Sequence, residues 1–465
     1  MEDRCCIILA AGDGKRMNSA NPKVLMPVLF EPMLGWVLDS VKEAGISDEN
    51  VGVITGSSAD KVAEYLKKRG KYHTFLQAER KGTGHAVMQA ESMLVEDISK
   101  DVLILCGDAP FMDAATINAA YKLHKEQNSD VTVITANVAP AGNYGRIKRD
   151  RNTNLLSSIV EMKDCSPDEL KITEVNSGAY WFKAERLLWA LPQLRDNNKS
   201  GEFYLTDTVK LLGKNTSTYM ADDSIIVLGA NDRKQLRELN DMMTELINSR
   251  HYAAGVDIIG HNVIIGKDVK IARDTLLMPN TIIRGKTEIG SGCVIGPNTQ
   301  IDNCEIGENV TLNCVQAFDA KICDNVKAGP FVHIRAGTTL NKNVKIGDFV
   351  EVKNSEIGEG TALAHLTYIG DSDVGKNVNF GCGTVTANYD GIEKYRTKIG
   401  DNAFIGCNTN LIAPVEVGEN AATAAGSTIT NNVPPAALAI ERGQVNIKEN
   451  WYKNELRIKK DKKSK

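Results

Sequence analysis

The sequence predicts an α/β fold in two parts, an amino-terminal Rossmann-like sheet flanked by helices and a carboxy-terminal left-handed parallel β-helix. Over about the first 230 residues, short apolar runs alternate with apolar residues at helical spacing, which is typical of a mostly parallel sheet covered on both faces. Much of the remainder counts in sixes, with an aliphatic residue at every sixth position. This period fits neither a helix nor an alternating strand and indicates the hexapeptide repeats of a β-helix. The 465 residues are also too many for one compact domain.

The expected elements of the first part follow one another in chain order. Because ligands of such sheets bind beyond the carboxyl ends of the strands, chemistry is expected where two strands run into Gly12 and into Gly107-Asp108. The expected strands are 5–10, 51–55, 74–77 and 102–106, and the expected helices are 32–44, 58–68 and 81–94.

The six-residue count of the second part is continuous within three stretches, 265–301, 322–352 and 399–429. Each short strand of a β-helix directs one aliphatic side chain into a triangular core. Three hexads make a coil, so about ten coils are expected between residues 256 and 440. The count breaks between Thr386 and Ile399, and insertions in such repeats project as loops, often on the binding face.

These patterns divide the chain into four segments. The first is a nucleotide-binding type of α/β domain, 1–230, and a linker helix, 231–252, follows it because apolar residues recur there at helical spacing. The β-helix is assigned to 253–445. The lysine-rich segment 446–465 is interpreted as a solvated tail rather than a binding arm.

The overall composition excludes several classes of protein. The net charge of −4 gives no overall basic surface for nucleic acid. No segment has the length and apolar character of a signal peptide or a membrane span, so no membrane insertion is expected. The ten cysteines include no Cys-x-x-Cys pair, which predicts reduced thiols, no structural zinc and a cytoplasmic location.

The loop after the first strand is suited to a phosphate group. Its sequence is Leu9-Ala10-Ala11-Gly12-Asp13-Gly14-Lys15-Arg16-Met17, followed by Pro22-Lys23. Two glycines let backbone N–H groups approach an anion, and Arg16 and Lys23 add positive charge. Taken alone, the glycines are equally consistent with a tight strand-to-helix turn, and no Walker A sequence is present.

Further motifs give this loop a context. The stretch resembles the L-A-A-G-x-G-x-R-M…P-K signature of sugar-1-phosphate nucleotidyltransferases. Together with the hexads, the layout from Ile8 to Arg442 resembles the bacterial family of bifunctional N-acetylglucosamine-1-phosphate uridyltransferases and glucosamine-1-phosphate N-acetyltransferases, the GlmU family. The other matching motifs are Gln77 with Gly82-Thr83-Gly84-His85-Ala86, Gly107-Asp108, Tyr144-Gly145-Arg146-Ile147, residues 159–164 and 174–178, Tyr204-Leu205-Thr206-Asp207 and Asn231-Asp232-Arg233.

The resemblance implies a cytoplasmic enzyme that makes UDP-N-acetylglucosamine in two steps, as a precursor for peptidoglycan and lipopolysaccharide-type envelopes. Acetyl-CoA would acetylate glucosamine-1-phosphate, and UTP would then transfer a uridyl group to the product and release pyrophosphate. The resemblance further implies Mg²⁺ as cofactor, acetyl-CoA and UTP as co-substrates, small molecules as partners, and a homotrimer.

Roles at the amino-terminal site also follow from the resemblance. Asp108 and Asn231 would hold Mg²⁺, and Arg16 and Lys23 would stabilise charge on the phosphates. By itself Asp108 could cap a helix, but a carboxylate at a strand end in a phosphate site suits a metal ligand. Lys15 and Cys106 depart from the residues usual in the family. The substrate-binding residues would be Leu9, Ala10, Ala11, Gly12 and Lys23 in the loop, Gln77, Gly82 and Thr83 at the uracil, and Gly145, Glu161 and Asn176 at the sugar.

Roles at the carboxy-terminal site follow in the same way. His365 would be the base that takes a proton from the attacking amine, and Glu351 would orient it, as carboxylates do for other catalytic histidines. A lone histidine is more often structural, and an arbitrary lysine is usually solvated, so the motif context carries these assignments. Arg335, Lys353, Tyr368, Asn379, Asn388, Tyr389 and Lys394 would bind the sugar phosphate, and Cys407, Ala425 and Arg442 would bind acetyl-CoA; Cys407 stands where the family commonly has serine.

Two alternative functions remain open to the sequence. One is a nucleotidyltransferase of the ADP-glucose pyrophosphorylase type, in which the hexads regulate and no acetyl group is transferred. The motif around His365 and the insertion at 388–394 argue against it. The other is a non-catalytic regulatory subunit, which is disfavoured because Arg16, Lys23, Asp108 and Asn231 are all present.

Overall fold

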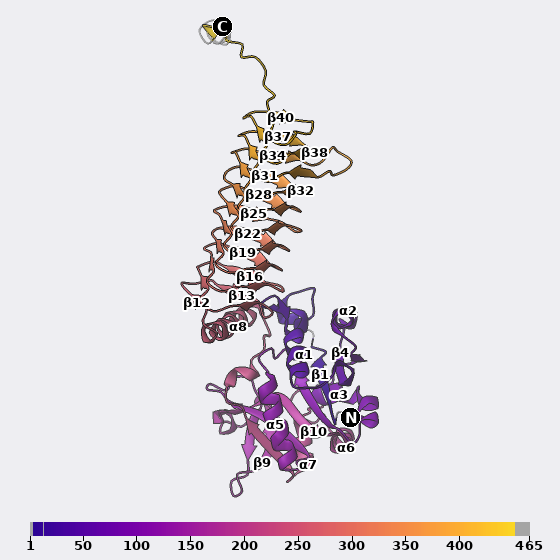
Figure 1. The fold of residues 1–465 in the computed structure, drawn as a ribbon. Helices are drawn as coiled ribbons and strands as arrows, with labels where there is room; N and C mark the ends of the chain where they lie inside the picture. Colours follow the sequence, from indigo (N-terminus) through magenta and orange to yellow (C-terminus); the bar gives the residue numbers. More distant parts are fainter. Residues whose placement is uncertain (1–2, 13, 452–465) are drawn as a thin grey trace, which may run out of the picture. The chain divides into compact units, whose positions relative to one another are not determined.

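The protein is described by a computed structural model that covers residues 3–12 and 14–451 (Figure 1). Most of the expected basic tail, residues 452–465, therefore lies outside the described residues. The chain divides into two compact units, Met1–Met243 and Thr244–Lys465, and each is presented separately. Within the described ranges, no helix combines the length and apolar character needed to cross a membrane.

The first unit is built on a nine-stranded sheet with four parallel and four antiparallel strand pairs, so it is mixed where the sequence predicts a mostly parallel sheet. The expected strands are all present, and the one at 51–55 has the expected bounds. The strand β10 runs antiparallel to all three strands that it pairs with, β6, β7 and β8. In sheet order the strands are β11 Thr216–Met220, β7 Val131–Asn137, β10 Glu174–Lys183, β6 Asp101–Cys106, β1 Arg4–Ala10, β4 Val51–Thr55 and β5 His73–Leu76. Off this order, β8 Arg146–Arg149 pairs with β10, and β9 Leu156–Val160 pairs with β8. Apart from this sheet, β2 Pro27–Val28 pairs with β3 Glu31–Pro32.

Helices pack on both faces of this sheet because neighbouring residues of a strand point to opposite sides. Cys6 and Ile8 belong to one buried cluster with Leu34 of helix α1. Cys5 and Ile7 belong to a second cluster with Val87 of α3. The helices of this unit are α1 Met33–Glu43, α2 Ala59–Arg69, α3 Thr83–Met88, α4 Glu91–Glu96, α5 Ala114–Glu126, α6 Ala184–Ala190 and α7 Asp207–Leu212, while α8 Arg233–Ala253 spans the boundary between the units.

The helix expected at 81–94 is two helices, α3 and α4, with a turn between them. The backbone N–H groups of Gln89 and Ala90 bond three residues back instead of four, which tightens the chain at this point. Val87, Ala90 and Leu94 are nevertheless all buried. The apolar pattern therefore continues across the turn, and for this reason the pattern alone predicts one helix.

The second unit is a parallel β-helix, as the hexads predict (Figure 1). Ile265 pairs with Ile283, and Ile283 pairs with Ile301, so that each coil advances the chain by three hexads. All three side chains are fully buried. After Ile301 some coils are shorter, since Glu288 pairs with Glu305 and Glu305 with Lys321. These shorter coils change the phase of the hexads without inserting a loop.

Three sheets form the faces of this β-helix, one for each hexad of a coil. The first consists of β12 Asp257–Ile258, β15 Leu276–Leu277, β18 Val294–Ile295, β21 Thr311–Leu312, β24 Lys327–Ala328, β27 Lys345–Ile346, β30 Ala362–Leu363, β33 Asn379–Phe380, β36 Phe404–Ile405, β39 Ala422–Thr423 and β41 Leu438–Ala439. The second consists of β13 Ile264–Ile265, β16 Ile282–Arg284, β19 Gln300–Asp302, β22 Val315–Phe318, β25 Val332–Ile334, β28 Glu351–Lys353, β31 Tyr368–Gly370, β34 Val385–Ala387, β37 Asn410–Ile412 and β40 Thr428–Ile429. The third consists of β14 Lys270–Ile271, β17 Glu288–Ile289, β20 Glu305–Ile306, β23 Lys321–Ile322, β26 Thr339–Leu340, β29 Glu356–Ile357, β32 Ser372–Val374, β35 Thr397–Ile399 and β38 Val415–Val417.

The break in the hexad count is a loop between β34 and β35 that leaves the stack of coils (Figure 1). An antiparallel bridge between Tyr389 and Lys394 closes it. The expected insertion is thus a short hairpin-like loop, and it carries three of the residues expected at the sugar phosphate.

Candidate active sites

The amino-terminal candidate site lies at the carboxyl ends of the adjacent parallel strands β1 and β6. Leu9 is aligned with Cys106, and the N–H of Gly107 donates to the carbonyl oxygen of Leu9 at 2.9 Å. The loop that begins at Ala11 and the Gly107-Asp108 pair therefore leave the same edge of the sheet. This is the position at which parallel sheets bind ligands.

Lys23 lies between the two residues that were expected to hold a metal. Its ammonium Nζ donates to Asn231 Oδ1 at 2.6 Å and forms an ion pair with Asp108 Oδ2. A Cβ on Gly14 would approach Lys23 Cβ to 2.6 Å, and Gly14 has a φ of 58°. Only glycine therefore fits beside Lys23 without displacing it.

The donor set around Lys23 fits Mg²⁺. The ammonium is a cation that contacts oxygens of Asp108 and Asn231 together, so these two oxygens can approach one small ion. Mg²⁺ is typically held by few protein oxygens, with waters and substrate phosphates completing the octahedron. No cluster of three or more His, Cys, Asp or Glu side chains suited to a metal occurs in residues 3–12 and 14–451.

A hollow of about 220 Å³ gathers most of the residues expected at the nucleotide. The amide Nε2 of Gln77 donates to the carbonyl oxygen of Gly82 at 3.0 Å, and Thr83 Oγ1 accepts from the N–H of Leu205 at 3.0 Å. These bonds hold Gln77, Gly82 and Thr83 in place in the lining of the hollow. Its lining consists of Leu9, Ala11, Gly12, Gln77, Gly82, Thr83 and Ala86, with Arg80 and Glu202, which the sequence did not single out.

Three of the expected residues of the loop, Ala10, Arg16 and Lys23, lie outside this lining. Ala10 lines a much smaller neighbouring space with Ala11 and Gly12. Arg16 is exposed in the short turn Lys15–Met17. The structure therefore brings Lys23, but not Arg16, into contact with Asp108.

The residues expected at the sugar are in mutual contact. The N–H of Asn176 donates to the carbonyl oxygen of Gly145 at 2.9 Å, and a Cβ on Gly145 would lie 3.5 Å from the carboxylate of Glu161. Glu161 accepts a hydrogen bond from Thr206 Oγ1 at 3.1 Å. Burial removes water from Glu161 and raises its pKa. A hydroxyl group of a ligand could form a hydrogen bond with this carboxyl group in place of water.

Cys106 lies next to this cluster as a neutral thiol. Its Sγ is 3.7 Å from the carbonyl oxygen of Gly178. Burial, and then the charge of Asp108, raises the pKa of Cys106 to about 12. The thiol is therefore an inert small side chain in this position.

The carboxy-terminal candidate site is organised by one column of coil positions. Tyr368 is aligned with Glu351 in the preceding coil and with Val385 in the next. The same register continues to Asn410 and Thr428. The residues three positions earlier in each coil stack in the same register. They form one corner column, which consists of Asp348, His365, Cys382, Cys407 and Ala425.

Backbone hydrogen bonds support this corner column. In the first two steps, the N–H of Leu366 donates to the carbonyl oxygen of Asp348, and that of Gly383 donates to His365. The next steps repeat the pattern at Cys382 and Cys407. Three residues expected in catalysis or acetyl-CoA binding, His365, Cys407 and Ala425, thus share the column. Asp348 and Cys382 were not expected, although counting back and forward by 17 residues from His365 finds both.

The carboxylate that contacts His365 is Asp348. Its Oδ1 is 2.8 Å from the imidazole Nδ1. The contact expected between Glu351 and His365 is not formed, because Glu351 is aligned with Tyr368 and its Oε1 accepts from Arg335 Nη1 at 2.7 Å. The family resemblance implies Glu351 as the partner, whereas the coil register brings Asp348 to the histidine.

A cluster of positive charge lies on the same sheet as Tyr368. Arg335 and Lys353 follow in register at the ends of β25 and β28. Lys394, in the inserted loop, adjoins Lys353. The neighbouring Lys394, desolvation and the charge of Arg335 lower the pKa of Lys353, against the opposing effect of Asp371. Like charges held close together suit a dianionic phosphate.

Asp371 anchors the base of this cluster. It accepts hydrogen bonds from Asn354 Nδ2 at 2.5 Å and from Nδ2 of the buried Asn388. Burial raises the pKa of Asp371, but these two bonds and the nearby lysines outweigh it and lower the pKa overall. Through this bond Asn388 ties the root of the inserted loop to the coils.

The other expected residues of this site are more dispersed. Tyr389 is exposed, and its hydroxyl donates to the carbonyl oxygen of Gly391 within the loop. Asn379 is exposed on the neighbouring sheet. Arg442 follows the last strand, β41, in an exposed segment outside the coils.

An exposed apolar ridge runs beside the corner column. It consists of Phe331, Phe349 and Leu366, which are 60%, 56% and 60% exposed. The two phenyl rings stack with centroids 5.2 Å apart. All three residues have positive φ, and they border a hollow of about 380 Å³ that Glu351 and Tyr368 also line.

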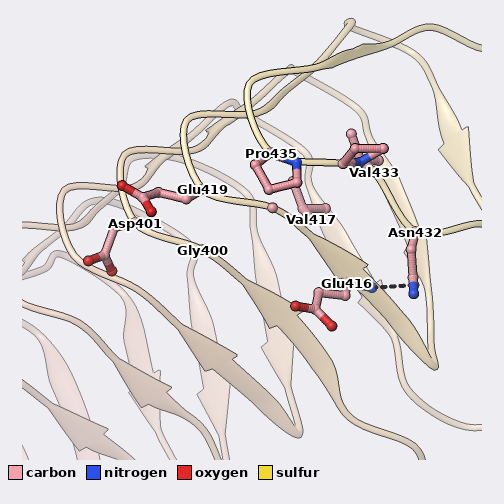
Figure 2. Close-up of a pocket in the computed structure, with 10 residues that line it drawn as sticks. Gly400, Asp401, Glu416, Val417, Glu419, Asn432, Val433 and Pro435 are labelled. Atoms are coloured by element: carbon pink, nitrogen blue, oxygen red, sulfur yellow. Dashed lines mark hydrogen bonds between the residues drawn. The ribbon is translucent and has the colours of Figure 1, made fainter.

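A second hollow in the β-helix is acidic. Figure 2 shows the carboxylates of Asp401, Glu416 and Glu419 around it. Its volume is about 490 Å³, and it contains none of the residues expected at the acetyl transfer site. Three carboxylates would repel a sugar phosphate, so this hollow is not a candidate for that substrate.

Known proteins are similar to this chain along its whole length. Residues 5–245 match the family model described as nucleotidyl transferase, and 268–303, 319–354 and 396–431 match the model described as bacterial transferase hexapeptide (six repeats). Relatives named bifunctional protein GlmU from Acetivibrio thermocellus, Thermoanaerobacter pseudethanolicus and Geobacillus sp. are 44%, 46% and 45% identical. Each alignment covers 99% of this chain, and the alignments cover 100%, 99% and 100% of the three relatives.

Proposed function

Because this chain belongs to the family of bifunctional GlmU proteins, we propose that it makes UDP-N-acetylglucosamine with one reaction in each unit. The β-helix transfers an acetyl group from acetyl-CoA to glucosamine-1-phosphate. The α/β unit then transfers the uridyl group of UTP to the acetylated sugar phosphate and releases pyrophosphate. The product is a precursor for cell-envelope polysaccharides. The enzyme acts in the cytoplasm, where these small molecules are found.

The single observation that supports uridyl transfer best is the meeting of Lys23, Asp108 and Asn231 at the end of β1 and β6. In-line attack of a sugar phosphate oxygen on the α-phosphorus needs alignment and neutralised charge more than a protein nucleophile. Mg²⁺ held by Asp108 and Asn231 would supply part of that charge. Lys23, joined by Arg16 from the loop, neutralises the triphosphate and the departing pyrophosphate.

The walls of the same site position the two reactants. Gln77, Gly82 and Thr83 recognise the uracil, and residues 9–12 bring the backbone of the loop to the phosphates. Gly145, Glu161 and Asn176 bind the N-acetylglucosamine part. The contacts among these residues support the assignment, since each group is already held in place by neighbours.

Acetyl transfer is assigned to the corner column and the cationic cluster beside it. His365 accepts a proton from the attacking amine, while Arg335, Lys353 and Lys394 hold the phosphate, with Arg335 braced by Glu351. Tyr368, Asn379, Asn388 and Tyr389 complete the sugar site. Acetyl-CoA lies along Cys407 and Ala425 and meets Arg442, with a thiol at Cys407 that is a weaker hydrogen-bond partner than a serine hydroxyl.

A homotrimer is part of this proposal. Phe331, Phe349 and Leu366 form an exposed apolar ridge next to the corner column, and apolar surface of this kind is typical of a protein contact. A neighbouring copy that covers the ridge would close the open side of the acetyl transfer site. The flat parallel faces of a β-helix favour such packing.

The proposal is tested by supplying purified protein with glucosamine-1-phosphate, acetyl-CoA, UTP and Mg²⁺, and measuring free CoA and pyrophosphate separately. We expect both products, loss of CoA release in His365→Ala, and loss of pyrophosphate release in Asp108→Ala. Pyrophosphate formed only from added N-acetylglucosamine-1-phosphate, without CoA, would show that the β-helix has no acetyltransferase activity.

A further inference from the structure

We infer that Asp348 is a positioning residue of the acetyl transfer site, which holds the imidazole of His365 in the tautomer that can act as a base. The inference rests on the proposed acetyltransferase function. It starts from the 2.8 Å contact between Asp348 Oδ1 and His365 Nδ1. Asp348 stands at the same coil position as His365, one coil earlier, in the corner column.

The backbone fixes both residues relative to each other. The N–H of Leu366 donates to the carbonyl oxygen of Asp348 at 3.1 Å, so the two corners are stacked directly. The next corner of the column carries Cys382, whose neighbour Gly383 donates to the carbonyl oxygen of His365 at 3.2 Å. The only carboxylate that the described residues place against the imidazole is therefore that of Asp348.

A carboxylate on Nδ1 decides which ring nitrogen carries the proton. An ionised carboxylate can only accept, so Nδ1 must be the protonated nitrogen. The backbone N–H of Asp348 and the contact with His365 lower the pKa of Asp348, which keeps this carboxyl group ionised. Nε2 is then left with its lone pair directed away from Asp348, ready to accept a proton.

Acetyl transfer exchanges one bond of the acetyl carbon for another. The amine nitrogen forms a bond to the acetyl carbon, and the bond between that carbon and the CoA sulfur breaks. The amine proton moves to His365 Nε2, and CoA leaves as a thiolate that recovers the proton. Asp348 stays ionised throughout and stabilises the transient imidazolium.

Exposure decides how large the effect is. The side chains of His365 and Asp348 are 56% and 43% exposed, so their ion pair adds little to folding. The effect on catalysis can be larger than the effect on folding, because a His365 side chain in the wrong tautomer has no basic Nε2. We expect a loss of about ten- to a hundredfold, below the roughly 10⁴-fold loss known for a buried triad carboxylate.

The decisive variant is Asp348→Asn in the full-length protein. The amide keeps the shape of the side chain, but it can donate to Nδ1 and so stabilise the tautomer that lacks a basic Nε2. We expect kcat for CoA release to fall about ten- to a hundredfold, with KM for both substrates unchanged. Pyrophosphate release from added N-acetylglucosamine-1-phosphate serves as an internal control and keeps its normal rate.

Two further variants separate positioning from other effects. Glu351→Gln loosens Arg335 and should raise KM for glucosamine-1-phosphate instead of lowering kcat. Asp268→Asn makes the same chemical change at an exposed position in the first coil and should change neither constant.

The outcomes are distinguishable. If His365→Ala abolishes CoA release but Asp348→Asn retains normal kcat, the inference about Asp348 is wrong and the proposed function stands. If the unaltered protein releases no CoA, both fail together. A rise in KM with unchanged kcat in Asp348→Asn would also overturn the inference, since it would place Asp348 in substrate binding.

Discussion

The ammonium group of one residue, Lys23, occupies the site that we assign to a metal ion. The ammonium of Lys23 contacts Asp108 and Asn231, and its side chain is only 11% exposed. In the free protein it therefore neutralises the site that we assign to Mg²⁺. When metal and nucleotide bind, the same ammonium can turn to the phosphates, so one lysine serves both states.

This arrangement predicts that Lys23→Met binds a divalent cation more tightly in the absence of nucleotide. Without the ammonium, the charge of Asp108 is no longer compensated, and a cation no longer has to displace it. We expect about tenfold higher affinity for Mn²⁺, equivalent to about 1.4 kcal/mol, measured by electron paramagnetic resonance titration. Pyrophosphate release should fall in the same variant because the phosphates lose a partner.

Lys67→Met, at an exposed position of helix α2, is the matched control and should bind Mn²⁺ as the unaltered protein does. Equal Mn²⁺ affinity in Lys23→Met would mean that the ammonium does not compete for the metal position.

A second prediction at this scale concerns pH. Because Lys394, desolvation and Arg335 lower the pKa of Lys353, Lys353 loses its proton at lower pH than an ordinary lysine does. Binding of glucosamine-1-phosphate should therefore weaken as pH rises through the alkaline range, where Lys353 becomes neutral. In Lys394→Met the pKa of Lys353 rises, so KM is higher overall but its increase begins at higher pH. Measuring KM from about pH 7 to 10 tests this, and an unshifted profile would contradict it.

At the scale of elements, the hexads predict the core of the β-helix because one buried residue per strand is a local, periodic requirement. Ile265, Ile283 and Ile301 illustrate it. The same periodicity places Asp348 beside His365, one coil apart, whereas the family resemblance implies Glu351. Register information was present in the sequence, and only the step from period to partner was missing.

The contact of Lys23 with Asp108 and Asn231 is different, because no period relates these three positions. The strand ends predict that Gly12 and Asp108 lie at one edge, and the sheet confirms this. The sequence has no local signal that brings Asn231 to the same point. The turn between α3 and α4 escaped prediction for a related reason, since burial of Val87, Ala90 and Leu94 continues across it.

The stacking of coils predicts a difference between two equivalent core substitutions. Ile369 and Ile283 are both fully buried in the second sheet, so replacing either with alanine should destabilise the β-helix by about 2–5 kcal/mol. Ile369 adjoins Tyr368 in β31, and its loss should also disturb His365 and reduce CoA release. Ile283→Ala should leave that activity intact at temperatures where the protein remains folded.

Thermal unfolding followed by separate assays of CoA and pyrophosphate gives both quantities. Equal loss of CoA release in Ile369→Ala and Ile283→Ala would show that the site does not depend on its local coil.

At the scale of the whole molecule, the two units have separate cores and separate sheets, so we expect the two reactions to be separable. The amino-terminal fragment must include Asn231, since a fragment that ends at residue 230 would lose this proposed metal ligand. A fragment of residues 1–250 retains Asn231 and most of α8. It should release pyrophosphate from UTP and N-acetylglucosamine-1-phosphate at close to the normal rate, and release no CoA.

Assembly should matter for only one of the reactions. Phe331→Asp together with Phe349→Asp places charge on the exposed ridge. Because both rings are exposed and do not belong to the buried core, folding should be little affected. If a neighbouring copy covers the ridge, burying two carboxylates there is strongly unfavourable, and the trimer should dissociate. Light scattering should then report a monomer that has lost CoA release and kept pyrophosphate release. Leu155→Asp, an exposed apolar residue of the first unit, should preserve the trimer and both activities. A monomer with normal CoA release would show that one chain contains the complete acetyl transfer site.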